Sequence, residues 1–236
     1  MTTLGLLHPG HAAEDDYPRI EQLLGSDIRV ELVHTDTGTD TGPTAVDALR
    51  RETPDRLAPA VEGLRLAGAE AAVWAGGGFA PGWEAAHEQI RALALAAGTP
   101  ASSTAFGFVH AAREIGVTRV AVGSAWPEEV AALFGAFLRA GGVEVVAPSG
   151  GSAGTGGAEE VFALARAADT PDAEAILLPD PALHTVAHLP ALEKELGKPV
   201  LTAHQVTVWE ALRLTERRVH APGLGALFTR EPIVQA

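Results

Sequence analysis

The feature that most constrains the fold is a regular alternation between short apolar runs and amphipathic segments of helical period. Runs such as AILL, apolar at every position, are typical of strands buried on both faces, as in parallel sheets. Strands are predicted at residues 3–8, 28–34, 70–75, 118–123, 143–147, 174–178 and 199–202. Helices are predicted at residues 54–67, 83–97, 104–115, 127–140, 158–168, 184–196 and 205–214. This alternation predicts an α/β fold with mainly parallel sheets, flanking helices and right-handed crossovers.

The chain also contains an internal repeat. Residues 98–112 (GTPASSTAFGFVHAA) and 197–211 (GKPVLTAHQVTVWEA) both read Gly-x-Pro, then small polar residues, then an amphipathic helix. A helix precedes each copy, and before that helix a strand opens into a loop. The offset of about 99 residues between the copies predicts two similar α/β lobes.

Composition limits the functions that are compatible with the chain. The formal net charge is −13, which argues against nucleic acid as a partner because phosphate binding needs clustered Lys and Arg. Cysteine is absent, which excludes disulfides, thiolate metal sites and a cysteine nucleophile. The first residues have no signal-peptide pattern, and no segment approaches the roughly 18 apolar residues of a membrane span. A cytoplasmic protein without a membrane partner is therefore expected.

A carboxylate and an imidazole follow a buried strand in the stretch ILLPDPALHTVAHLP, residues 176–190. Asp180 lies between two prolines, and His184 comes four residues later. Ligands of open α/β sheets bind beyond the carboxyl ends of the strands, and burial there raises the pKa of a carboxyl group. Asp180 is therefore a candidate acid/base group with His184 bonded to it. The alternative is that Asp180 caps a helix beginning near Ala182, with or without a functional role.

Other candidate residues also follow predicted strands. The AGGGF run, residues 75–79, offers backbone N–H groups before a helix near Trp83, which suits a carboxylate cradle; a tight turn that needs glycine for positive φ explains it equally well. We expect one cleft to be lined by His8, His11, Trp74, Gly76, Trp126, Asp180 and His204.

Three stretches carry a resemblance to a known family: AREIGVTRVAVGSAWPEEV, AEAILLPDPALHTVAHLPALEKELGKPVLTAHQVTVWEALRL and APGLGALF. Through them, residues 3–228 resemble the aspartate/glutamate racemase superfamily, and more closely its maleate isomerase and arylmalonate decarboxylase branch. The resemblance implies two pseudo-symmetric α/β lobes with a substrate cleft between them, and a C-terminal segment that returns to the first lobe. The implied lobes are residues 1–102 plus 209–236, and residues 103–208.

The chain departs from the family where the family carries its proton-transferring cysteines. Trp74 and Asp180 stand at the two cysteine places, Trp126 stands for a carboxylate-binding tyrosine, and His204 stands for an asparagine. Two-thiol racemisation and cysteine-adduct isomerisation are therefore excluded. Ala75 and Gly76 lack the hydroxyl donors of the family, and Pro181 lacks an N–H. By resemblance, the substrate-binding residues are His8, His11, Trp74, Ala75, Gly76, Gly77, Trp126, Ala182 and His204.

Three hypotheses remain open. The first is a cofactor-independent lyase or isomerase for a small carboxylate, with Asp180 as the acid/base and His8, His11 or His204 helping to bind charge. The second is a carboxylate-binding protein or pseudoenzyme that kept the cleft and lost the chemistry. The third is a His-based metal site, because HPGH and HTVAH carry imidazoles at spacings that suit zinc. The sequence leaves the oligomeric state and the substrate open.

Overall fold

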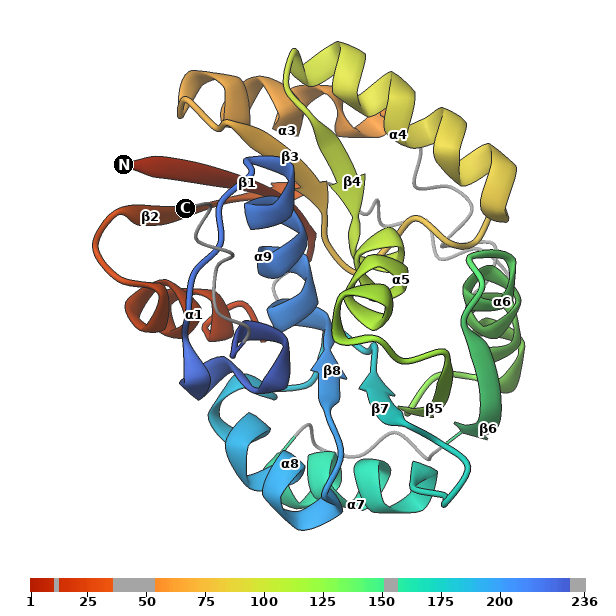
Figure 1. The fold of residues 1–236 in the computed structure, drawn as a ribbon. Helices are drawn as coiled ribbons and strands as arrows, with labels where there is room; N and C mark the ends of the chain where they lie inside the picture. Colours follow the sequence, from red (N-terminus) through yellow and green to blue (C-terminus); the bar gives the residue numbers. More distant parts are fainter. Residues whose placement is uncertain (11–12, 36–53, 151–156, 230–236) are drawn as a thin grey trace, which may run out of the picture.

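Two four-stranded parallel sheets form the centre of the protein (Figure 1). The computed structural model describes residues 1–10, 13–35, 54–150 and 157–229. The first sheet has the order β2-β1-β3-β4, with β1 Thr2–Pro9, β2 Ile28–Thr35, β3 Ala71–Trp74 and β4 Ala101–Ser103. The second has the order β6-β5-β7-β8, with β5 Arg119–Ser124, β6 Glu144–Gly150, β7 Ala175–Leu178 and β8 Val200–Thr202. The predicted two-lobed α/β fold is confirmed.

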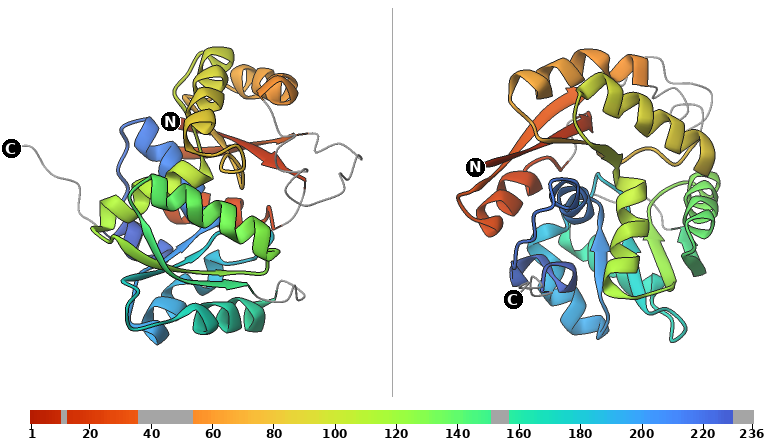
Figure 2. Two further views of the ribbon diagram at one scale, coloured as in Figure 1. Left: turned by 90° about the vertical axis from the view of Figure 1, so that its right-hand side faces the viewer. Right: turned by 45° about the horizontal axis from the view of Figure 1, so that its top comes forward.

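Helices cover both sheets (Figure 2). They are α1 Asp16–Leu24, α3 Pro54–Leu66, α4 Trp83–Ala97, α5 Thr104–Ile115, α6 Glu128–Ala140, α7 Ala158–Ala168, α8 Leu189–Leu196 and α9 Ala203–Leu214. Short 3₁₀ helices are η1 Val186–His188, η2 Pro222–Leu224 and η3 Ala226–Phe228. The sequence prediction missed α1 and β4, and it placed one helix at residues 184–196 where η1 and a shorter α8 occur.

The internal repeat is visible as two strand–helix units. β4 and α5 in the first copy correspond to β8 and α9 in the second, with each element displaced by the same interval along the chain. The helices α5 and α9 pack against each other in the middle of the molecule (Figure 1). Their close approach depends on Gly107, where a Cβ would come within 2.9 Å of Val206 Cγ1.

The lobes share one large hydrophobic core. It joins Leu4 and Val73 of the first sheet, Phe134 of α6, Leu177 of β7 and Phe228 of η3. The helix α9 packs on β1, β3 and β4 of the first sheet, although it follows β8 of the second. A boundary after residue 208 therefore falls within a helix that joins the lobes. In the part of the chain that the structure describes, no helix is long and apolar enough to cross a membrane.

Candidate active site

Two loops from different lobes touch at the carboxyl ends of the sheets. The glycine loop (residues 75–79) follows β3, and the Asp180 loop (residues 179–185) follows β7. Gly76 has φ 71°, and a Cβ placed there would lie 2.8 Å from Pro181 Cγ. The close approach therefore needs glycine on one side and brings the loop that carries Asp180 against the first lobe.

Asp180 is partly exposed at the end of β7, and two N–H groups hold its carboxylate. Its Oδ1 accepts the backbone N–H of Ala182 at 2.9 Å, and the Trp126 side chain donates a second hydrogen bond. Burial raises the pKa of Asp180 above its ordinary value, the two hydrogen bonds oppose that rise, and the nearby negative charge of Glu160 adds to it. The net result is a pKa of Asp180 above the ordinary value of an aspartate.

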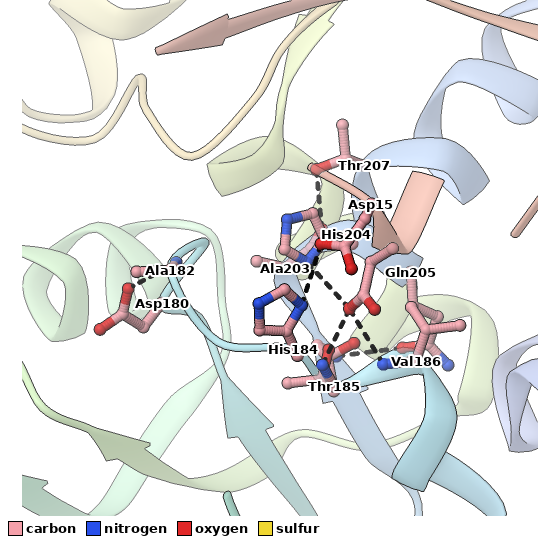
Figure 3. A network of polar contacts seen from close by, with 12 residues as sticks. Asp15, Asp180, Ala182, His184, Thr185, Val186, Ala203, His204, Gln205 and Thr207 are labelled. Atoms are coloured by element: carbon pink, nitrogen blue, oxygen red, sulfur yellow. Dashed lines mark hydrogen bonds and ion pairs between the residues drawn. The ribbon is translucent and has the colours of Figure 1, made fainter. Parts of the chain in front are cut away.

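The predicted helix cap at Asp180 is wrong. The bond to Ala182 closes a tight turn, η1 begins only at Val186, and α8 begins at Leu189. The predicted bond between His184 and Asp180 depended on that helix and does not form. Instead, the exposed His184 places Nδ1 3.1 Å from Asp15 Oδ1 at the start of α1. Figure 3 shows His184 beside Asp15, with Asp180 and Ala182 standing apart from them.

The glycine loop offers fewer free amides than the sequence suggested. The N–H of Ala75 donates to Leu7 O at 2.9 Å, and the N–H of Gly76 donates to Thr104 Oγ1 at 2.9 Å. Within the described residues, the amides of Gly77, Gly78 and Phe79 donate no hydrogen bond. A ligand carboxylate that met this loop would therefore find three backbone donors, whereas the Ala182 N–H is already used by Asp180.

Between the two loops lies a cavity of about 10 Å³, which is room for about one water molecule. Trp126 stacks on Phe79 with ring centroids 5.5 Å apart, and its edge meets Phe134 at 5.6 Å. A ligand needs these rings or the lobes to move apart. The cavity is lined by Gly76, Gly77, Phe79, Thr104, Ala105, Phe108, Trp126, Phe134 and Pro179.

Trp74 lies elsewhere. It is 2% exposed and packs in the core beneath α3 and α4, among Leu57, Leu64 and Leu93. The expectation that Trp74 lines the cleft is not met, because its side chain points to the face of the sheet that α3 and α4 cover. His11 lies outside the described residues.

A chain of hydroxyl groups, which no sequence pattern predicted, connects the glycine loop to α1. Thr104 Oγ1 lies 2.5 Å from Thr207 Oγ1, which donates to Ala203 O at 2.7 Å. The phenol of Tyr17 also bonds to Thr207, and burial raises the pKa of Tyr17 far above its ordinary value. Tyr17 therefore stays neutral and acts as a fixed hydrogen-bonding group.

His204 and His8 meet Tyr17 in the interior. The rings of His8 and His204 are nearly parallel with centroids 6.3 Å apart, and Tyr17 meets His204 edge-on at 4.8 Å. His204 is fully buried; neither ring nitrogen has a hydrogen-bond partner among the described residues, and Nδ1 lies 3.5 Å from Asp16 Oδ2. Burial lowers the pKa of His204 to about 3, so its imidazole is neutral near pH 7. His204 therefore cannot supply the positive charge that the sequence analysis assigned to it.

The two histidines of HTVAH do not meet at one site, and the HPGH spacing includes His11, which lies outside the described residues. His184 faces Asp15, whereas His188 packs its ring against Phe162 at 5.9 Å. Across the described ranges, no group of three or more His, Asp or Glu side chains is arranged to hold a metal ion. A larger hollow of about 980 Å³ lies between α1 and β2, bordered by Asp15, Tyr17 and His34, and it does not include Asp180.

Comparisons with known proteins agree with one another. The family model described as arylmalonate decarboxylase matches residues 50–228. An arylmalonate decarboxylase of Bordetella bronchiseptica is 31% identical over 149 residues, which are 58% of this chain and 61% of that protein. The alignment thus spans less than two thirds of that relative's length.

Solved structures share the fold over nearly the whole chain. A crystal structure of arylmalonate decarboxylase has a TM-score of 0.76 and 23% identity, covering 97% of this chain and 100% of the other. The maleate isomerase of Pseudomonas putida S16 has a TM-score of 0.83 and 17% identity, covering 97% and 98%. A cysteine-to-serine mutant of the Nocardia farcinica maleate cis-trans isomerase, with a covalently bound succinylcysteine intermediate, has a TM-score of 0.82 and 20% identity, covering 98% and 99%.

Proposed function

Because the chain belongs to the arylmalonate decarboxylase family, we propose that it is a cofactor-independent lyase or isomerase that transfers a proton at a carbon next to a carboxylate. Asp180 is the acid/base group, in place of a thiol. The observation that carries the proposal is the setting of Asp180: it lies at the carboxyl end of β7, partly buried, held by two N–H donors and in contact with the opposite lobe through Pro181.

A carboxyl group suits this role when its pKa lies near the working pH, so that it both takes and gives a proton. Burial moves the pKa of Asp180 in that direction. The N–H groups of Ala182 and Trp126 fix its orientation, which limits the positions a reacting carbon can take. A cysteine adduct of the kind named for the Nocardia farcinica protein cannot form here, because the chain has no cysteine.

For a malonate, the proposed reaction is a decarboxylation. The bond between the central carbon and one carboxylate breaks, CO₂ leaves, and the electron pair stays on the central carbon, stabilised by the remaining carboxylate. The protonated Asp180 gives its proton to that carbon and recovers one from solvent. The amides of Gly77, Gly78 and Phe79 are the donors left in the glycine loop for the remaining carboxylate. The substrate class is a small organic acid, and the predicted cytoplasmic location stays a prediction.

A second candidate is a carboxylate-binding protein without turnover. The observations that favour it are the internal use of the Ala75, Gly76 and Ala182 amides and the cavity of about 10 Å³. Each donor missing from a transition-state cradle costs about 3 kcal/mol of transition-state stabilisation.

One experiment separates the two candidates. The protein is incubated in D₂O with phenylmalonate, maleate and a panel of small mono- and dicarboxylates; NMR follows decarboxylation, isomerisation and deuterium uptake at carbon, and thermal shift follows binding. We expect turnover with at least one acid, and Asp180→Asn should lose about 10²-fold or more while still binding it.

Asp172→Asn is the matched control, because Asp172 is an exposed acid just before β7 whereas Asp180 follows the same strand. This control should keep wild-type turnover. Full activity in Asp180→Asn would sink the acid/base role. Binding without any turnover in the wild-type protein would establish the second candidate.

A further inference from the structure

The Asp180 loop is held at its far end by a residue of the first lobe. Asp16, in the first turn of α1, accepts the backbone N–H of Thr185 at 2.8 Å and that of Val186 at 3.1 Å, both on Oδ2. Asp16 is 5% exposed and Thr185 1%, so these bonds are shielded from water. The two N–H groups open the turn that leads into η1 and α8, so a carboxylate of one lobe caps a helical segment of the other.

The segment between Asp180 and Thr185 is too short and too tightly bonded to move independently of its ends. The side chain of Asp180 accepts Ala182 N–H at 2.9 Å, and its carbonyl accepts Leu183 N–H at 3.4 Å. The Leu183 side chain is 3% exposed and packs in the core of the second lobe, near Leu178. Displacement of Thr185 therefore shifts the turn that orients the Asp180 carboxylate.

The other end of the loop also rests on the first lobe, where Pro181 lies against Gly76. The loop that carries Asp180 thus starts and ends on contacts with the lobe opposite to its own. Of these two contacts, the Asp16 contact is made of charge-assisted hydrogen bonds to backbone N–H groups, which are about twice as strong as neutral ones. The neighbouring contact of Asp15 with His184 is between exposed side chains and is much weaker.

We propose that Asp16 is a positioning residue for Asp180: by capping Thr185 and Val186 from the opposite lobe, it fixes the Asp180 loop against the glycine loop. The effect of Asp16 on catalysis rests on the proposed function. Its effect on the position and environment of Asp180 does not, and it is testable without any substrate.

The test compares Asp16→Asn with Asp15→Asn, two identical changes at adjacent positions of which only the first touches a backbone bond. Hydrogen exchange is followed for amides of residues 180–186, and ¹³C NMR follows the titration of the Asp180 carboxyl. In Asp16→Asn we expect exchange at Thr185 and Val186 to rise about tenfold or more. The Asp180 midpoint should fall towards its ordinary value as the loop opens to water. Asp15→Asn should change exchange by less than about twofold.

A merely structural role would give a different pattern. If exchange rises equally in β1, β7 and the loop, or if the Asp180 midpoint does not move, Asp16 is a general stabilising residue and the proposal is overturned. Should Asp16→Asn fail to fold, Asp16→Glu keeps the charge, displaces the carboxylate by one methylene and should shift both readouts in the same direction.

With an acid that the protein turns over, Asp16→Asn should lower kcat about tenfold with KM nearly unchanged, because Asp16 does not touch the ligand. An unchanged kcat would also overturn the proposal. If the wild-type protein turns over no acid, the proposed function fails, while exchange and titration still decide whether Asp16 positions Asp180.

Discussion

The glycine loop and the Asp180 loop hold equivalent places in the two sheets but carry opposite chemistry. Gly76 lies two residues past the end of β3, and Asp180 lies two residues past the end of β7. The first loop presents backbone groups and no polar side chain, and its Ala75 and Gly76 amides are used within the first lobe. The second presents a carboxylate and is tethered to the opposite lobe. At these two equivalent places, the titratable side chain therefore belongs to the second lobe alone.

The same asymmetry appears at the start of the repeated helices. His204 is the second residue of α9, whereas Ala105 is the second residue of α5, and both side chains are buried. In both pairs, the first repeat supplies a small apolar residue where the second supplies a titratable one. Under the proposed function, the acid/base group therefore belongs to the second lobe, and the first lobe provides the surface that faces it.

The largest expected effect tests whether the acid/base group lies on one lobe alone. A single acid/base group reaches a reacting carbon from one face only, so a malonate with two different substituents should give a product of one handedness. Chiral chromatography of the product measures this directly. A racemic product would show that a second proton donor acts from the first lobe. Asp180→Asn should lower the rate about 10²-fold or more.

The next effect concerns the contact between the loops. Gly76→Ala should destabilise the protein by about 2–3 kcal/mol, because it adds both a Cβ at positive φ and a clash with Pro181. Gly98→Ala is the matched control: Gly98 has φ 68°, but a Cβ there meets no atom within 4 Å. It should cost only the conformational part, about 1 kcal/mol. Urea unfolding measures both.

A double mutant identifies the source of the difference. Pro181→Gly removes the ring that the new Cβ would meet, so Gly76→Ala in that background should cost about as much as Gly98→Ala. Equal costs of Gly76→Ala in both backgrounds would mean that the loops do not press on each other, and the comparison between them would lose its structural basis.

The sequence predicts those features that depend on interactions between residues close together along the chain. Periodicity revealed the long helices and the apolar strands because both patterns are local. β4 escaped because its residues, ASS, contain no apolar run. α1 escaped because it is short and has Pro18 in its first turn. Asp16 could not be recognised as a cap, since the amides it binds are 169 and 170 residues away in the sequence.

The candidate site shows the same limit. Asp180 was recognisable as a carboxylate that follows a buried strand, but its hydrogen-bond partners, the Ala182 N–H and the Trp126 side chain, were not. The spacing of four residues to His184 suggested a helix, whereas a turn at Ala182 delays the first helical residue to Val186 and aims His184 at Asp15. Burial, which sets the pKa values of Asp180 and His204, depends on the packing of both lobes and has no local signature.

A moderate effect should come from His204, the titratable member of the second pair. Its pKa falls from 6.5 to about 3 on folding, so the unfolded chain binds a proton more readily than the folded protein between those values. Above pH 6.5 the imidazole is neutral in both states, so burying it costs no protonation free energy. As the pH falls from 6.5 towards 3, the free energy of unfolding falls by about 1.4 kcal/mol per pH unit. Asp16 changes the free energy of unfolding with pH in the opposite direction, because burial raises its pKa.

The measurement is urea unfolding of the wild-type protein and His204→Asn at pH 6.5 and pH 5. Between these values the wild-type protein should lose about 2 kcal/mol that the variant does not lose. Parallel losses in both proteins would mean that His204 is not held neutral by burial. Ala105 has no titratable group, so the equivalent position in the first repeat adds no pH dependence to the free energy of unfolding.

The smallest effect distinguishes the two acids at the start of α1, which reach the same loop from the first lobe. Asp15 meets His184 at 3.1 Å, but the two side chains are 78% and 47% exposed, so water and salt screen their attraction. Asp15→Asn should therefore cost less than about 1 kcal/mol, and high salt should abolish even that. Asp16→Asn should cost about 1.5–3 kcal/mol with little dependence on salt, because its hydrogen bonds are buried. Urea unfolding at low and high salt measures both. A cost for Asp15→Asn equal to that for Asp16→Asn would show that the exposed pair, rather than the buried cap, holds the Asp180 loop to the first lobe.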